Sequence, residues 1–169
     1  MSFDLNRYGM DDRDGDGQKN NPKPQAEQQA VVKLISKVNP DILAVQEIGD
    51  PAAFEAFQRA LKNVGIEYEF TEYLETEQST YHLAMLSRFP IMSSWSHKDD
   101  RYSMGDANVL LTHGIIDVDI GVNPGYEFKL MVAHLKSKEF HPLGQTEMRR
   151  NEARLLNKHM RRALKKIRV

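Results

Sequence analysis

Apolar residues recur at the spacing of an amphipathic helix in three stretches of the chain. The first runs from about Gln25 to Val38 and ends before Asn39-Pro40, since the residue before a proline is disfavoured in the helical region. The second begins at Pro51, which the first turn of a helix tolerates. The third is long, from about Gln145 to Ile167. We expect its inner face to consist of Ala153, Leu156, Met160, Leu164 and Ile167.

Short apolar runs between these helices predict strands. The run from Asp41 to Ile48 is almost continuously apolar, as expected of a strand buried on both faces. The other expected strands are Ser2–Asn6, Tyr68–Leu74, Tyr81–Ser87, Ile91–Trp95, Val109–Ile120 and Phe128–Leu135, with a loop at 97–107. Helices and strands alternate early and strands cluster later, which predicts a single α/β (α+β) domain over residues 1–169. We expect mixed β-sheet layers flanked by helices.

Composition narrows the class of protein. Hydrophobic residues make up 40% and charged residues 28%, which is typical of a globular domain. The chain has no cysteine, so disulfides, thiolate catalysis and zinc–sulfur sites are excluded. No apolar run reaches the length of a membrane span, and no signal-peptide pattern is present. We therefore expect a soluble, cytoplasmic protein, unless a signal sequence has been removed.

Charge is unevenly distributed, although the net charge is only −1. From Glu147 onwards there are nine Lys or Arg residues against two Glu. Such a block of like charge is typical of a solvated helix face. It is also suited to contact with a phosphate backbone, and the sequence leaves both interpretations open.

Four segments carry polar side chains on or after predicted strands. They contain Asp4, Glu47, the pair Ser87-Arg88, and His134. In open α/β sheets the carboxyl ends of strands gather functional groups, so these side chains are candidates for one site. Glu47 follows an apolar run, where an ionised carboxylate needs a partner. That partner is either an Arg or Lys, or a divalent cation, for which oxygen ligands favour Mg²⁺ or Mn²⁺ over zinc.

An acidic loop precedes the first helix. Asp12, Asp14, Asp16 and Gly17 fit the first half of a calcium loop, D-x-D-x-D-G. Position twelve is Lys23 rather than the bidentate Glu of a calcium loop, and no helix precedes the segment. The alternative is a turn closed by Asx hydrogen bonds, without Ca²⁺.

The four polar segments, in this order, resemble the endonuclease/exonuclease/phosphatase superfamily, which includes deoxyribonuclease I and exonuclease III. PDILAVQE at Pro40–Glu47 is similar to the family's metal-binding strand, and Glu47 falls on the metal-binding Glu. HLAMLSRFP at His82–Pro90 and VAHLKS at Val132–Ser137 resemble two further family strands. The opening Met1–Leu5 is also similar, with Asp4 where the family has Asn. The segment Arg150-Asn-Glu152-Ala resembles a family helix.

The resemblance implies cation-assisted hydrolysis of a phosphodiester or phosphomonoester. Glu47 would be the principal Mg²⁺ or Mn²⁺ ligand, helped by Asp4. His134 would donate a hydrogen bond to the phosphate as charge develops. The substrate would be a nucleic acid or another phosphate ester. The competing interpretation of His134 is a histidine satisfied within a packed strand.

Two family motifs that follow the long helix, G-D-F-N and D-H, are not found in this sequence. The resemblance therefore implies a truncated β-sandwich that is a poor catalyst as a monomer. We expect a homodimer, because the strand Phe128–Leu135 carries apolar groups on both faces and would lack a neighbour. The alternative function is a catalytically inactive remnant that acts as a dimeric binding or structural module.

Overall fold

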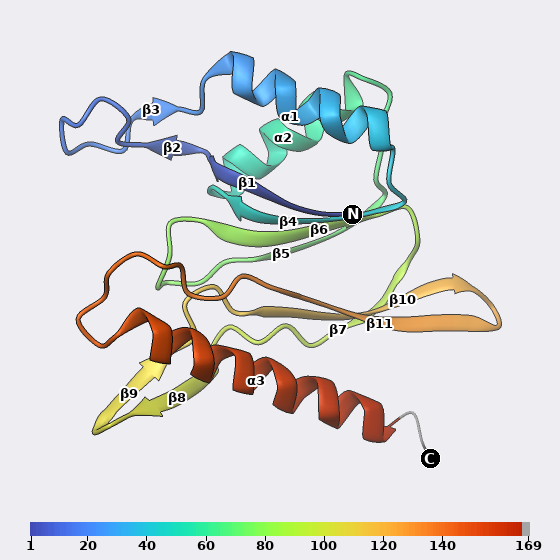
Figure 1. Cartoon of the computed structure of the whole chain (residues 1–169). Helices are drawn as coiled ribbons and strands as arrows, with labels where there is room; N and C mark the ends of the chain where they lie inside the picture. Colours follow the sequence, from blue (N-terminus) through green and yellow to red (C-terminus); the bar gives the residue numbers. More distant parts are fainter. Residues whose placement is uncertain (167–169) are drawn as a thin grey trace.

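The computed structural model describes residues 1–166 of the chain as four stacked layers (Figure 1). Helices α1 (Gln25–Val38) and α2 (Pro51–Lys62) cover one face of a first sheet. A second sheet packs on the other face, and helix α3 (Gln145–Lys166) lies beyond it. The mixed α/β class and the two stacked sheets predicted from the sequence are confirmed.

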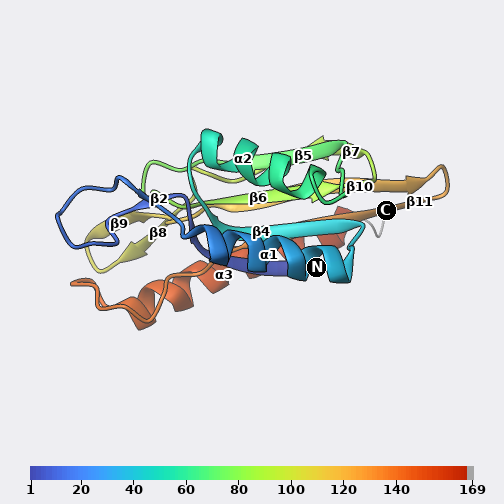
Figure 2. The same cartoon turned by 90° about the horizontal axis from the view of Figure 1, so that it is seen from above.

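The first sheet has the strand order β1 (Ser2–Tyr8), β4 (Ile42–Ile48), β6 (His82–Ser87) and β5 (Phe70–Leu74). Strands β1 and β4 are parallel, whereas β6 is antiparallel to both β4 and β5. The core beneath the two helices includes Leu5, Ile35, Leu43, Val45 and Phe57. Asp50 caps α2 by accepting a hydrogen bond from the Ala53 N–H at 2.8 Å, directly before Pro51. Figure 2 shows α1 and α2 side by side above the sheet.

The second sheet has the order β11 (Tyr126–Ala133), β10 (Ile115–Asn123) and β7 (Ile91–Ser94), with antiparallel pairs throughout. A second core joins the two sheets, because successive residues of β4 face opposite sides. Leu43 and Val45 point toward the helices, and Ala44 points toward the second sheet. The second core is completed by Leu83, Met85, Ile116, Val118, Ile120 and Val132 among others.

Two small hairpins lie at the same end of the molecule (Figures 1 and 2). One is formed by β2 (Met10–Asp11) and β3 (Asn21–Pro22), the other by β8 (Arg101–Met104) and β9 (Ala107–Leu110). The predicted loop at 97–107 was therefore partly wrong. The two-residue turn of the second hairpin is possible because Gly105 adopts φ +58°. The predicted strand Val109–Ile120 is likewise interrupted between β9 and β10.

The inner face of α3 differs from the prediction. Met148, Glu152 and His159 are its buried residues within the described chain. Glu152 and His159 form hydrogen bonds beneath the helix, so partly polar contacts fix which face turns inward. Three residues predicted to lie inside are exposed: Ala153, Met160 and Leu164. Ile167 lies outside the described residues. Among residues 1–166, no helix is both long and apolar enough to cross a membrane.

Candidate functional site

Three of the predicted site residues meet at one end of the sandwich. Asp4 lies on β1 beside Gln46 of β4, Glu47 is the next residue of β4, and His134 follows β11 directly. One ligating atom from each of the three lies within 4.8 Å of the other two. The first sheet supplies the carboxylates and the second sheet supplies the imidazole. The site therefore exists only when the two sheets are packed together.

Glu47 is held from two sides. Its Oε1 lies 3.4 Å from Nε2 of His134, and its Oε2 accepts a hydrogen bond of 2.9 Å from the backbone N–H of Arg7. Glu47 also has a φ of +59°, in the left-handed region that non-glycine residues rarely adopt. Such conformations persist only where the surroundings enforce them, and they concentrate at functional sites.

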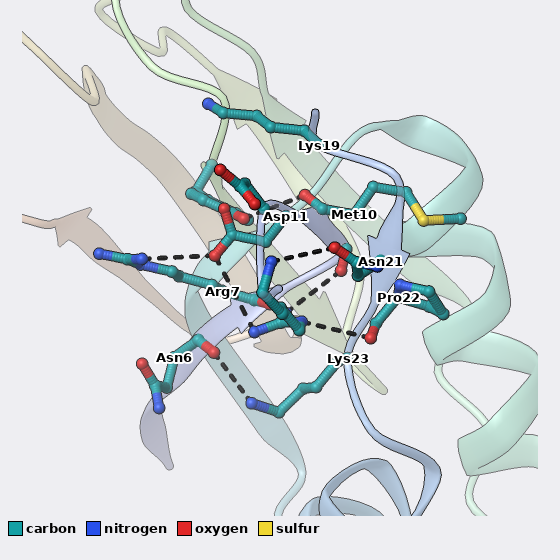
Figure 3. A network of polar contacts seen from close by, with 12 residues as sticks. Asn6, Arg7, Met10, Asp11, Lys19, Asn21, Pro22 and Lys23 are labelled. Atoms are coloured by element: carbon teal, nitrogen blue, oxygen red, sulfur yellow. Dashed lines mark hydrogen bonds and ion pairs between the residues drawn. The ribbon is translucent and has the colours of Figure 1, made fainter. Parts of the chain in front are cut away.

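The turn that presents the Arg7 N–H is fixed by a polar network (Figure 3). Asn6 and Arg7 have φ values of 50° and 60°, which bend the chain at the end of β1. Lys23 is 4% exposed and donates to the carbonyl of Asn6 at 2.9 Å. Arg13 donates to the carbonyl of Arg7 at 2.7 Å, and Arg7 pairs with Asp11 at 3.3 Å. These contacts explain why the last residues of β1 keep a strained backbone beside the site.

Glu47 and His134 shift each other's pKa toward the charged form. The hydrogen bond from His134 lowers the pKa of Glu47, and it does so against the opposing effect of burial. The same bond raises the pKa of His134, and the charge of Asp4 adds to this effect. Both shifts favour a carboxylate facing an imidazolium. The site therefore offers two anionic oxygens for a cation and one cationic donor for an anion.

His134 is supported by residues that sequence reasoning did not assign to the site. The His113 ring meets the His134 ring edge to face at 4.7 Å, and Nδ1 of His113 lies 3.2 Å from the carbonyl of Tyr81. Burial, together with the charge of His134, lowers the pKa of His113 to about 4. His113 is therefore neutral at physiological pH and does not compete with His134 for Glu47.

Glu152 of α3 anchors the segment that follows His134. Its side chain is fully buried and accepts a hydrogen bond from the backbone N–H of Lys136 at 2.5 Å. It also accepts one from the Thr112 hydroxyl at 3.2 Å. Sequence reasoning noted Glu152 only as part of a helix motif. The signal in the sequence is the spacing. Glu152 follows Met148 by four residues, which places both side chains on the same face of α3.

The segment Ser87-Arg88 lies at the opposite end of the first sheet, so its expected place in the site was wrong. Strand β6 runs antiparallel to β4, which pairs Ser87 with Ile42 and His82 with Ile48. Arg88 instead pairs with Asp41 at 3.0 Å. The carboxyl ends of strands meet only when the strands are parallel, and here they are not.

The acidic loop has the Asx hydrogen bonds of a turn and also the grouped carboxylates of a calcium loop. Asp12 accepts hydrogen bonds from the N–H groups of Gly15 and Gly17, at 2.8 and 3.0 Å. Asp14 and Asp16 accept from the backbone two residues further on, which is the Asx-turn pattern. One carboxylate oxygen from each of the three Asp residues also lies within 4.8 Å of the others. The loop is thus closed by its own hydrogen bonds and still groups three carboxylates.

Comparison with known proteins is consistent with this geometry. Residues 4–165 match the Endonuclease/Exonuclease/phosphatase family. The fold is similar to that of SmcL, with a TM-score of 0.63 and 16% identity over 96% of this chain and 57% of that chain. It is also similar to humanized D. rerio TDP2, with a TM-score of 0.51 and 16% identity over 99% of this chain and 54% of that one.

A family protein from Leptotrichia buccalis C-1013-b is similar over 82% of this chain and 55% of its own, with a TM-score of 0.51 and 13% identity. The chain thus spans little more than half the length of these three structures. No curated protein matches the sequence significantly. At these identities the structural likeness describes the fold alone.

Proposed function

Because the chain belongs to the endonuclease/exonuclease/phosphatase family, we propose that the site at Asp4, Glu47 and His134 hydrolyses a phosphate ester with the help of a divalent cation. The observation that carries this proposal is the convergence of two carboxylates and a protonatable imidazole from two different sheets. The family match supports the class of reaction, and the site geometry supports the roles of the residues.

The donor set of the site suits a hard cation. Asp4 and Glu47 offer carboxylate oxygens, the ligands that Mg²⁺ and Mn²⁺ prefer. Arg7 contacts Glu47 through its backbone N–H, while its guanidinium pairs with Asp11 and Glu139. Glu47 would be the principal ligand and Asp4 the second. When bound, such a cation polarises a phosphoryl oxygen and stabilises the leaving oxygen.

His134 would stabilise the phosphate directly. Glu47 raises the pKa of His134, which favours the protonated form that donates a hydrogen bond. The His113 ring contacts the imidazole, and Glu152 holds the backbone of Lys136, two residues after His134. A donor fixed in advance contributes most where negative charge develops on the phosphate oxygens in the transition state.

A nucleic acid is the substrate class we favour. Four cations of α3, Arg150, Arg154, Lys158 and Arg161, follow one another at spacings of three or four residues and line a shallow depression on the surface. A row of cations along a helix matches the regular negative charge of a phosphate backbone. This row supports a polyanionic substrate over a small phosphate ester.

We also propose that two copies of the chain associate through β11. Within residues 1–166 this strand is an edge of the second sheet and pairs only with β10. Phe128 and Leu130 remain partly exposed on it. An edge of this kind favours pairing with a second strand, and two-fold symmetry is the commonest arrangement. Light scattering during size exclusion should give about twice the chain mass of 19.4 kDa, whereas 19.4 kDa at micromolar concentration would contradict the dimer.

Hydrolysis of a generic phosphodiester tests the proposed activity. We expect release of product that requires added Mg²⁺ or Mn²⁺ and stops when EDTA is added. Activity that is indifferent to both would assign the chemistry to another site. No hydrolysis under any condition, together with binding of single-stranded or duplex DNA, would favour the alternative of a catalytically silent binding module.

A further inference from the structure

We propose that His97, Asp100 and His159 form a second metal site, for a borderline transition ion such as Zn²⁺, between α3 and the outer face of the second sheet. His97 follows β7, Asp100 precedes β8, and His159 lies on α3. One ligating atom from each of the three lies within 4.8 Å of the other two. This site is separate from Asp4, Glu47 and His134, and no step of the proposed hydrolysis uses it.

The three side chains are already gathered. Nε2 of His159 lies 2.5 Å from Oδ2 of Asp100, and the two imidazole rings stack with their centroids 3.7 Å apart. His159 is 8% exposed, although α3 is otherwise rich in charged residues. A zinc ion with ligands at about 2.0–2.1 Å needs donor atoms roughly 3.4 Å apart in a tetrahedral arrangement. The ligating atoms lie within 4.8 Å of one another, so binding would require the two rings to rotate out of their stack.

The orientation of His97 is fixed by a carboxylate behind it. Nε2 of His97 lies 3.3 Å from Oδ2 of Asp117, a residue of β10. Asp117 is in turn held by Lys129, whose Nζ lies 2.7 Å from Oδ1. This arrangement assigns Nδ1 of His97 to the ion. Metal-binding histidines commonly donate their other ring nitrogen to a carboxylate in this way.

The charges of this region also favour a cation. Two carboxylates contact the stacked rings: Asp100 lies beside His159, and Asp117 lies beside His97. Lys129 pairs with Asp117 on the far side. Two imidazole nitrogens and one carboxylate form a donor set that suits Zn²⁺ better than Mg²⁺. Three protein ligands leave the fourth position of a tetrahedron to water. The ion would join α3 to the segment between β7 and β8.

Titration with Co²⁺, which reports its coordination through visible absorption, tests the site in the intact chain. We expect one equivalent to give the strong bands of a tetrahedral complex and Zn²⁺ to displace it. His159→Gln should weaken binding at least tenfold. Asp117→Asn should weaken it about 10–100-fold, because the carboxylate behind the ligand is removed. The controls His134→Ala and His141→Gln should bind as the unchanged protein does.

Three results would overturn the proposal. One is the absence of tetrahedral cobalt bands in the unchanged protein. Another is binding that survives His159→Gln, and the third is binding that disappears in His134→Ala, which would place the ion at the other site. If His159→Gln fails to fold, X-ray absorption of the unchanged protein with one equivalent of Zn²⁺ decides. Two imidazole ligands would support the site, and fewer than two would contradict it.

Discussion

Nε2 of His134 lies 3.4 Å from Oε1 of Glu47, although the two residues are positioned by different sheets of the sandwich. Glu47 is a residue of β4, and His134 follows the end of β11. The contact joins the carboxylate we assign to the cation with the imidazole we assign to the phosphate. It also links the chemistry of the site to correct packing between the sheets.

Removal of either partner should abolish hydrolysis. Glu47→Gln keeps the shape of the side chain and removes the charge that a cation needs. His134→Ala removes the donor to the phosphate. We expect each variant to lose activity by at least about 100-fold, the scale measured when one preorganised donor is removed. Steady-state hydrolysis with saturating Mn²⁺ checks this, with Glu55→Gln on the exposed face of α2 as the matched control. Full activity in both variants would show that the reaction takes place elsewhere.

Glu152 should act on stability and on the site together. Glu152→Ala leaves the buried N–H of Lys136 and the hydroxyl of Thr112 without their acceptor. We expect a loss of about 3 kcal/mol in the free energy of unfolding, because hydrogen bonds to a buried charged group are involved. Glu152→Gln retains one acceptor oxygen and should lose less. Urea denaturation measures both variants, and equal stability of all three proteins would contradict the anchoring role.

His113 should make the protein sensitive to acid. Its pKa is about 4 in the folded protein, below the ordinary value of about 6.5 in the unfolded chain. Between these values the unfolded chain binds a proton that the folded chain does not, so stability falls as pH decreases from about 6.5 to about 4. The loss reaches roughly 3 kcal/mol at most. His113→Asn should flatten this part of the profile. Denaturation across this pH range tests it, and an unchanged slope in the variant would exclude His113 as the cause.

The acidic loop should bind Ca²⁺ through its three grouped carboxylates. Asp12, Asp14 and Asp16 group three carboxylate oxygens, and a Ca²⁺ ion would take the place of the Asx hydrogen bonds as their partner. Calorimetric titration at low ionic strength should give heat that Asp14→Asn reduces. An absence of heat with Ca²⁺ would leave the Asx-turn interpretation standing.

Local patterns identified most of the elements because they depend on neighbouring residues. The apolar run before Glu47 predicted a strand buried on both faces, and β4 does alternate between the two cores. Pro51 marked the beginning of α2. The same patterns placed Glu47 and His134 near the ends of predicted strands, and the structure brings the two side chains together.

The errors concern relationships that no local pattern contains. The direction of β6 depends on its pairing with β4 and β5. Because β6 runs antiparallel to β4, Arg88 lies at the opposite end of the sheet from Glu47. The inner face of α3 is set by Glu152 and His159, whose partners come from distant parts of the chain. A polar residue becomes favourable in a buried position only when such a partner is present. The sequence contains Glu152 and His159 but does not show that Thr112 and Asp100 are their partners.

Anomalous scattering from crystals soaked in millimolar Mn²⁺ tests the central claim most directly, that Glu47 is the principal ligand of a catalytic cation. We predict an anomalous peak beside the Glu47 carboxylate and within reach of Asp4. The peak should be absent from crystals of Glu47→Gln. Occupied manganese elsewhere with no density at Glu47 would contradict the proposed site.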